Sequence, residues 1–170
     1  MADILARIVC LYRPENDWTE VFSRNLNCPV VRIGRIKQPI ERTIIPGTTR
    51  RNDCDFYDID LSFARSTKGY YASKQHATMF KWSEMTDYQI MDGTYSTVTM
   101  SNPNPVVVPS SVGVYVNGRR LLAGEKYNLK DKDEIVLFPD RLKLIYLRPQ
   151  NTIADFLHDT IIPEEYRNQS

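Results

Sequence analysis

The feature that most constrains the fold is a long series of short strand-like runs. About ten runs rich in valine, isoleucine, tyrosine and threonine alternate with stretches that contain Gly, Pro, Asn or Asp. The chain has 170 residues, enough for one well-buried core and too few for two. The sequence therefore predicts one all-β domain, a sandwich of about ten or eleven antiparallel strands. The runs cover residues 4–12, 30–35, 55–63, 77–82, 88–92, 112–117, 119–123, 126–130, 133–138 and 142–148.

Two connections between these runs have the composition of tight turns. Asn117-Gly118 lies between two of the runs, and a two-residue turn with positive φ at both positions favours this pair. The last two runs are joined by Phe138-Pro139-Asp140-Arg141, which has proline at the second position of a four-residue turn. Both stretches therefore predict β-hairpins. Lys68-Gly69 and Asp92-Gly93 also have the composition of turns.

Three segments interrupt the strand pattern. They are residues 13–29, 36–54 and 94–111, and the last contains too many prolines for a central strand. We expect all three to be loops. Residues 1–150 then form one domain, with inserted loops at about 36–54 and 94–111.

The end of the chain, residues 151–170, has a helical period instead. Ile153, Phe156, Leu157 and Ile161 fall on one face of a helix. The sequence predicts a short C-terminal helix and a tail, and the helix would dock on the domain or on a partner.

Charge and hydropathy exclude several functions. With 22 basic and 21 acidic side chains, the chain has no overall field that would recruit nucleic acid or an anionic membrane. No stretch reaches the roughly 20 apolar residues that span a bilayer. Asp3 and Arg7 place charges where a signal peptide needs an apolar run. We therefore expect no nucleic-acid partner, no membrane insertion and a cytoplasmic location.

The cysteines and the known cofactor motifs give no sign of a metal or cofactor. Cys10, Cys28 and Cys54 are widely spaced, odd in number and without a CxxC pair, which indicates reduced thiols. No P-loop, dinucleotide fingerprint, HExxH or EF-hand pattern is present. We expect neither a metal site nor any other cofactor.

The stretch Ser73-Lys74-Gln75-His76, directly before a predicted strand, has three possible interpretations. A hydrolase could use Ser73 as nucleophile and His76 as base, but this spacing does not aim the two side chains at each other, and no GxSxG motif is present. Alternatively, Ser73 caps a turn and His76 hydrogen-bonds to backbone. In the third interpretation the stretch is an anion-binding loop.

Four signals in a fixed order favour the anion-binding loop. Gly34-Arg35 ends one predicted strand, Ser73-x-x-His76 precedes another, a segment from Gly113 ends in Asn117-Gly118, and LKDKDEI follows at 129–135. This order resembles the forkhead-associated (FHA) domain, a phosphothreonine-binding β-sandwich. The resemblance covers about residues 4–148. The amino-acid sequence of residues 58–77 is most similar to that of bacterial, and specifically cyanobacterial, members of the family.

The resemblance implies a role for each residue of the loops. A phosphothreonine carries about −1.5 to −2 charges, so its receptor needs a fixed guanidinium, a hydroxyl and further donors. In the family, residues at the positions of Arg35 and Ser73 contact the phosphate, and Lys74 can add a donor. His76 would brace the loops without acting on the ligand. The resemblance also assigns loop-shaping roles to Gly34, Gly113, Asn117 and Gly118.

The last binding loop departs from the family pattern. Ser111 corresponds to the hydroxyl residue of this loop and would support the peptide. Members that bind well have Asn where this chain has Val112, and valine cannot donate a hydrogen bond to the peptide backbone. The loss of one such hydrogen bond costs about 1 to 3 kcal/mol. Two further features stand near the site in the sequence: Tyr70-Tyr71, and Arg50-Arg51, which would extend the anionic pocket or form a solvated charge pair.

The most favoured function is therefore a phosphothreonine-dependent protein–protein interaction module that is not an enzyme. Its partner would be a phosphothreonine-containing protein. The alternative is a phosphate-independent scaffold that uses its insertions and C-terminal helix. Val112 and the insertions favour the scaffold, whereas Arg35 and Ser73 oppose it. The sequence leaves the oligomeric state open.

Overall fold

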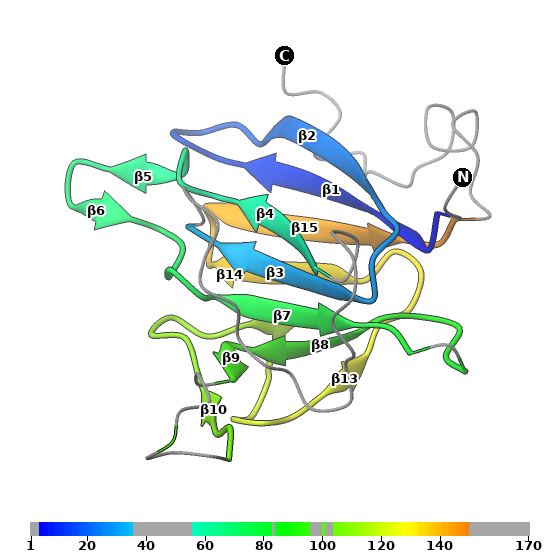
Figure 1. The fold of residues 1–170 in the computed structure, drawn as a ribbon. Coiled ribbons are helices and arrows are strands. Elements are labelled where there is room, and N and C mark those ends of the chain that lie inside the picture. The colour runs from blue at the N-terminus through cyan, green and yellow to red at the C-terminus, as the bar shows by residue number, and fades with distance from the viewer. Residues whose placement is uncertain (1–3, 36–55, 83, 96–99, 101–103, 150–170) are drawn as a thin grey trace.

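The computed structural model describes residues 4–35, 56–82, 84–95, 100 and 104–149 (Figure 1). In this part of the chain the secondary structure consists of β-strands. The strands are β1 Ala6–Tyr12, β2 Thr19–Leu26, β3 Val30–Gly34, β4 Phe56–Asp60, β5 Arg65–Ser66, β6 Gly69–Tyr70, β7 Ala77–Phe80, β8 Gln89–Asp92, β9 Thr94–Tyr95, β10 Val107–Val108, β11 Tyr115–Val116, β12 Arg119–Arg120, β13 Tyr127–Asn128, β14 Glu134–Phe138 and β15 Leu142–Leu147.

Two sheets build the body of the domain. One has six strands in the order β12-β11-β14-β15-β1-β2, and the other has five in the order β13-β8-β7-β3-β4. Two short ladders, β5 with β6 and β9 with β10, extend from this body (Figure 1). The two sheets share one apolar core, to which Ile8 and Leu144 contribute from the first sheet and Ile33 and Met79 from the second. The predicted all-β sandwich is confirmed.

A second apolar cluster lies on the other face of the six-stranded sheet. It consists of Val9 and Leu11 on β1 and Ile145 and Leu147 on β15. Successive residues of a strand point to opposite faces. These four side chains therefore point away from the interior, while their neighbours Ile8, Cys10, Leu144 and Tyr146 point into it. We call this cluster the outer face.

The predicted hairpins have the expected geometry. Asn117 and Gly118 have φ values of 49° and 86°, and β11 and β12 pair on either side of them. In the second hairpin the N–H of Arg141 donates to the carbonyl of Phe138 at 3.1 Å, and Asp140 takes the positive φ of 62°. Each of the ten predicted runs contains a strand.

The loop prediction for residues 13–29 was wrong, because β2 occupies Thr19–Leu26. Most of this strand is exposed or half-buried, and Leu26 alone is fully buried. An edge strand of this kind has little apolar alternation, so its sequence looks like a loop. β2 nevertheless pairs with β1 along its length, from Ala6↔Leu26 to Tyr12↔Thr19.

One pair departs from the predicted antiparallel arrangement. β3 and β4 are parallel, with Val30 opposite Phe56 and Gly34 opposite Asp60. A parallel pair needs a crossover of a dozen or more residues. The chain between β3 and β4 is long enough, but residues 36–55 lie outside the described residues, as do the predicted loop 36–54 and Arg50-Arg51.

The other two predicted non-strand segments have different outcomes. Within 94–111, β9 and β10 form a short ladder with Tyr95 opposite Val107, so part of this predicted loop is paired. Pro105 and Pro109 stand just outside β10, where they remove no ladder hydrogen bond. The predicted C-terminal helix falls in residues 150–170, which are not among the described residues.

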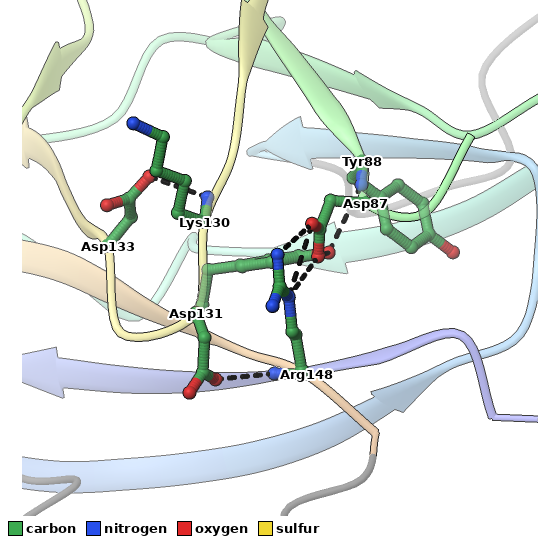
Figure 2. Close-up of polar contacts among 7 residues, drawn as sticks. Asp87, Tyr88, Lys130, Asp131, Asp133 and Arg148 are labelled. Carbon is green, nitrogen blue, oxygen red and sulfur yellow. Dashed lines mark hydrogen bonds and ion pairs between the residues drawn. The ribbon is translucent and has the colours of Figure 1, made fainter.

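A cluster of polar side chains links several loops at the end of the sandwich where β15 ends (Figure 2). The Nε and Nη2 of Arg148 donate to the Asp87 carboxylate at 2.7 to 3.2 Å, and its backbone N–H donates to Asp131 at 2.8 Å. The Tyr146 hydroxyl donates to Asp87 at 3.1 Å and accepts the N–H of Tyr88 at 3.1 Å. We call this region the Asp87 end.

Candidate functional site

Three loops meet at the opposite end of the sandwich. They are residue 35 after β3, residues 71–76 before β7, and residues 109–114 between β10 and β11. Ile33 at the end of β3 pairs with Ala77 at the start of β7, so the first two loops lie at the same end of the five-stranded sheet. We call this region the Arg35 end.

The His76 side chain holds two of the three loops together. It is fully buried, and its Nδ1 accepts the backbone N–H of Ser73 at 3.0 Å. Because Nδ1 is an acceptor, the ring is neutral and its Nε2 donates to the Gly113 carbonyl at 2.8 Å. Burial lowers the pKa of His76, against opposing effects of the Gly113 carbonyl and the Asp92 carboxylate. The imidazole thus links the Ser73 loop to the Gly113 loop without charge.

Gly34 is required because the Ser73 loop passes directly over it. A Cβ at this position would lie 2.8 Å from the Ser73 carbonyl oxygen and closer still to the carbonyl oxygen of Lys74. Both neighbours are backbone atoms, which cannot move away as a flexible side chain can. The glycine therefore lets the loop approach the end of β3, where the N–H of Arg35 donates to the Ser73 carbonyl at 3.2 Å.

The Arg35 guanidinium is fixed by its inner nitrogen and by an aromatic ring. Its Nε donates to the Ala72 carbonyl at 2.8 Å, and its Cζ lies 4.5 Å from the centre of the Tyr70 ring. No residue that the structure describes accepts a hydrogen bond from either Nη atom. Arg35 therefore has an ordered, partly exposed cation whose outer donors are available to an anion.

Two hydroxyl groups complete this part of the site. The Oγ atoms of Ser73 and Ser111 lie 3.0 Å apart, so the second and third loops are in direct contact. The Lys74 side chain is exposed at the same loop, and Val112 is half-buried beside Ser111. The structure thus brings Arg35, Ser73, Lys74, Ser111 and Val112 to one end of the domain. Tyr70 also lies at the site, under Arg35.

Sequence reasoning missed the residues that shape the third loop. The buried Asp92 accepts hydrogen bonds from the backbone N–H of Ser110 at 3.1 Å and from its hydroxyl at 2.5 Å. The same Ser110 hydroxyl accepts the N–H of Gly113 at 2.8 Å. A serine three residues before a glycine is the spacing of a serine-capped turn, and this signal could have identified Ser110.

Asn117 and Gly118 do not shape the binding loops. Their turn lies at the far end of β11 from Gly113, and the Asn117 side chain donates to Asp133 at 2.8 Å and accepts the N–H of Glu134 at 2.9 Å. Asp133 in turn accepts the N–H of Lys130, in the loop drawn in Figure 2. This part of the loop-shaping assignment was wrong, because a short hairpin carries the motif away from the site.

The geometry also argues against a serine hydrolase. The Ser73 hydroxyl contacts Ser111, while the His76 imidazole contacts the Ser73 backbone and Gly113. A base must reach the hydroxyl proton of its nucleophile, and both ring nitrogens of His76 are engaged elsewhere.

The described residues lack two further features. Among them, no group of three or more His, Cys, Asp or Glu side chains could hold a metal ion. Nor does this part of the chain include a helix long and apolar enough to cross a membrane.

Comparison with protein families decides the classification. The model of the FHA domain matches residues 31–138, more than half of the chain, and this range includes all three loops. The chain belongs to the FHA family. FHA domains are phosphopeptide-binding modules of protein–protein interaction and are generally not enzymes. The family assignment predicted from the order of four sequence signals is confirmed.

Several solved structures are similar to this FHA domain. The yeast splicing factor Pml1 is 16% identical, with a TM-score of 0.49, over 84% of this chain and 78% of that chain. The Slr1951 protein from Synechocystis is 19% identical, with a TM-score of 0.45, over 84% of this chain and 96% of the other. The FHA domain of the CT664 protein from Chlamydia trachomatis is 15% identical, with a TM-score of 0.46, over 84% and 96%. The search of curated proteins found no match.

Proposed function

We propose that this FHA domain binds a phosphothreonine-containing segment of a partner protein through the Arg35 end. The observation that carries the proposal is the state of Arg35. Its Nε and its contact with Tyr70 hold the guanidinium, and neither Nη atom has an acceptor among the described residues. Binding a phosphate there would add charge-assisted hydrogen bonds without first breaking an ion pair.

The neighbouring loops supply the remaining groups. The Ser73 hydroxyl donates to a phosphate oxygen in place of its contact with Ser111, and the exposed Lys74 adds a second cation. Ser111 supports the peptide beside the modified residue. Because His76 fixes two of the three loops through backbone atoms, little conformational entropy is lost when the ligand binds.

The test compares phosphorylated and unphosphorylated peptide libraries. We expect the wild-type chain to bind a degenerate phosphothreonine library and not its unphosphorylated counterpart, as measured by fluorescence polarisation. Arg35→Ala should weaken binding by at least about tenfold, since hydrogen bonds to charged groups contribute about 1.5 to 3 kcal/mol. Arg24→Ala is the matched control, because this exposed arginine belongs to β2 and to none of the three loops, and its Cζ also lies over an aromatic ring, 4.6 Å from the centre of Phe22.

Two outcomes would contradict the proposal. One is phosphate-dependent binding that survives Arg35→Ala, which would place the phosphate elsewhere. The other is equal binding of the two libraries by the wild-type chain. A library with phosphoserine in place of phosphothreonine measures the preference for the threonine methyl group in the same experiment.

The second candidate function is a phosphate-independent scaffold. Val112 favours it, because valine has no side-chain donor for a peptide backbone. In that case neither library binds, while the purified chain still recovers a partner that Arg35→Ala does not release.

We also propose a cytoplasmic location and a bacterial, cyanobacterial-like origin, on the sequence patterns described above.

A further inference from the structure

The outer face of the six-stranded sheet is too apolar and too well buried to be an ordinary sheet surface. Val9, Leu11, Ile145 and Leu147 are 0 to 2% exposed. They form one strip, because Val9 pairs with Ile145 while Leu11 and Leu147 continue the strip at its two ends. Monomeric domains rarely leave a contiguous apolar strip to water. At 0 to 2% exposure this strip is already covered within the chain.

Among the described residues, one hydrophobic side chain contributes to that cover. Trp18 is the hydrophobic side chain among them that packs against the strip. The Lys143 amine lies 4.3 Å from the centre of its ring, and Lys143 pairs with Leu11, so the indole lies at the Leu11 end. Val9, Ile145 and Leu147 extend along the strands away from this position.

We propose that residues 151–161 of this chain cover the outer face as an amphipathic helix. β15 ends at Leu147, itself part of the strip. The five residues 148–152 can span at most about 17 Å, enough to turn back over β15 and β1. Ile153, Phe156, Leu157 and Ile161 then supply an apolar helix face of the kind that the strip needs.

Charge complementarity favours this segment as the occupant. Arg7 pairs with Leu147 and gives the strip a cation at that end, where its Nε is shared with Asn25. The segment carries Asp155 and Asp159 on its polar side. At the other end Glu20 stands opposite Leu11, and Glu134 binds the Lys143 amine at 3.3 Å. An acidic helix therefore suits the Arg7 end better than a basic partner would.

The consequence concerns the second candidate function. A helix that covers β1 and β15 in the same molecule is not presented to another protein. In the scaffold hypothesis this helix is an attachment point, so a partner protein would first have to displace it from the outer face. The phosphate-binding loops lie at the end of the sandwich and stay accessible in either case.

The experiment uses the whole 170-residue chain, in which Trp82→Phe makes Trp18 the single tryptophan. The double variant F156S/L157S removes the apolar face of the segment. H158S is the matched control, because His158 lies on the polar side of the same helix and carries none of the acidic charges that favour the Arg7 end. We expect F156S/L157S alone to increase quenching of Trp18 fluorescence by acrylamide and to abolish hydrogen-exchange protection at residues 153–161.

A variant on the sheet side makes the test independent of the tail substitutions. Val9→Ala trims the outer face, whereas Ile8→Val trims the interior face of the same strand. Val9→Ala should reduce exchange protection in 153–161, and Ile8→Val should leave it unchanged. Unprotected amides at 153–161 in the wild-type chain, or Trp18 quenching that F156S/L157S does not alter, would overturn the proposal. Protection that disappears on dilution, together with a dimeric mass, would assign the face to a second copy instead.

Discussion

Two half-buried arginines at opposite ends of the sandwich are held in different ways. At the Asp87 end, Arg148 donates from Nε and Nη2 to one carboxylate, and its own backbone is tied to Asp131 (Figure 2). At the Arg35 end, the contacts of the Arg35 guanidinium with described residues are one hydrogen bond from Nε to a backbone carbonyl and one aromatic ring. The first arrangement neutralises the cation within the domain, whereas the second positions it and leaves it charged. Under the proposed function, this difference separates a structural arginine from one placed for an anionic ligand.

The contacts that hold the backbone also differ between the two ends of the sandwich. The Arg35 end depends on close loop contacts that pass through Gly34 and His76. The Asp87 end depends on side-chain oxygens that bind backbone N–H groups, as Tyr146 binds Tyr88. Damage at the first end should therefore affect binding, and damage at the second should affect stability.

The largest effect is expected from Gly34→Ala. The added methyl group collides with the backbone of Ser73 and Lys74, at a cost of about 3 kcal/mol, the upper end for overpacking. Phosphopeptide binding should be lost with it, because the Ser73 loop must move. The control is Gly118→Ala, where a Cβ has free space but φ is 86°. It should cost about 1 kcal/mol and leave binding intact. Urea unfolding and peptide titration measure the two effects.

The next largest effect is expected from Tyr146→Phe at the Asp87 end. This change removes the hydroxyl that accepts the Tyr88 N–H and donates to Asp87. A buried donor left unpaired costs about 1 to 3 kcal/mol. We expect a lower urea midpoint with unchanged phosphopeptide affinity. Equal loss of stability and affinity would show that the two ends are not independent.

A smaller effect, on affinity alone, is expected from Val112→Asn. The new amide could donate to the peptide backbone next to Ser111, which is worth about 1 kcal/mol or a fivefold gain in affinity. Isothermal titration with one phosphothreonine peptide measures it, and Val112→Thr serves as a shape control. No gain with asparagine would mean that the third loop does not contact the peptide backbone.

The smallest effect is the pH dependence that arises from His76. Burial lowers the pKa of His76 from its ordinary value of 6.5. Between the lowered pKa and 6.5 the unfolded chain binds more protons than the folded chain, so stability falls as the pH falls below about 6.5. Exchange protection of the Ser73 N–H should decrease from pH 7.5 to 5.5, while that of Tyr88 should not. His158→Gln leaves His76 as the single histidine, so its titration can be followed by proton NMR. A ring that titrates at or above 6.5 would contradict this prediction.

Sequence reasoning succeeded where a short motif determines its own geometry. Gly34-Arg35, Ser73 and His76 were assigned from the resemblance of their motifs to the FHA family, and the structure brings them together at one end. The prediction that His76 braces the loops agrees with its contacts to Ser73 and Gly113. The binding roles of Arg35, Ser73, Lys74 and Ser111 stay predictions until peptides are tested.

Sequence reasoning failed where the geometry depends on residues that are distant in the sequence. β2 looked like a loop because an exposed edge strand needs no apolar alternation, and its pairing with β1 is not encoded locally. The parallel pairing of β3 with β4 cannot be read from either strand alone. Asn117 was assigned to the site because it follows Gly113 in the motif, although β11 carries it to the other end.

The pairing of β1 with β15 has a consequence for biosynthesis. Arg7 lies opposite Leu147, so β1 finds its central partner only when the much later strand β15 has emerged from the ribosome. Until then β1 can form the hairpin with β2 but cannot complete the larger sheet. Such late, non-local closure favours slow folding and leaves an aliphatic strand edge open to aggregation during translation. A chaperone that shields extended segments would protect the chain during this interval.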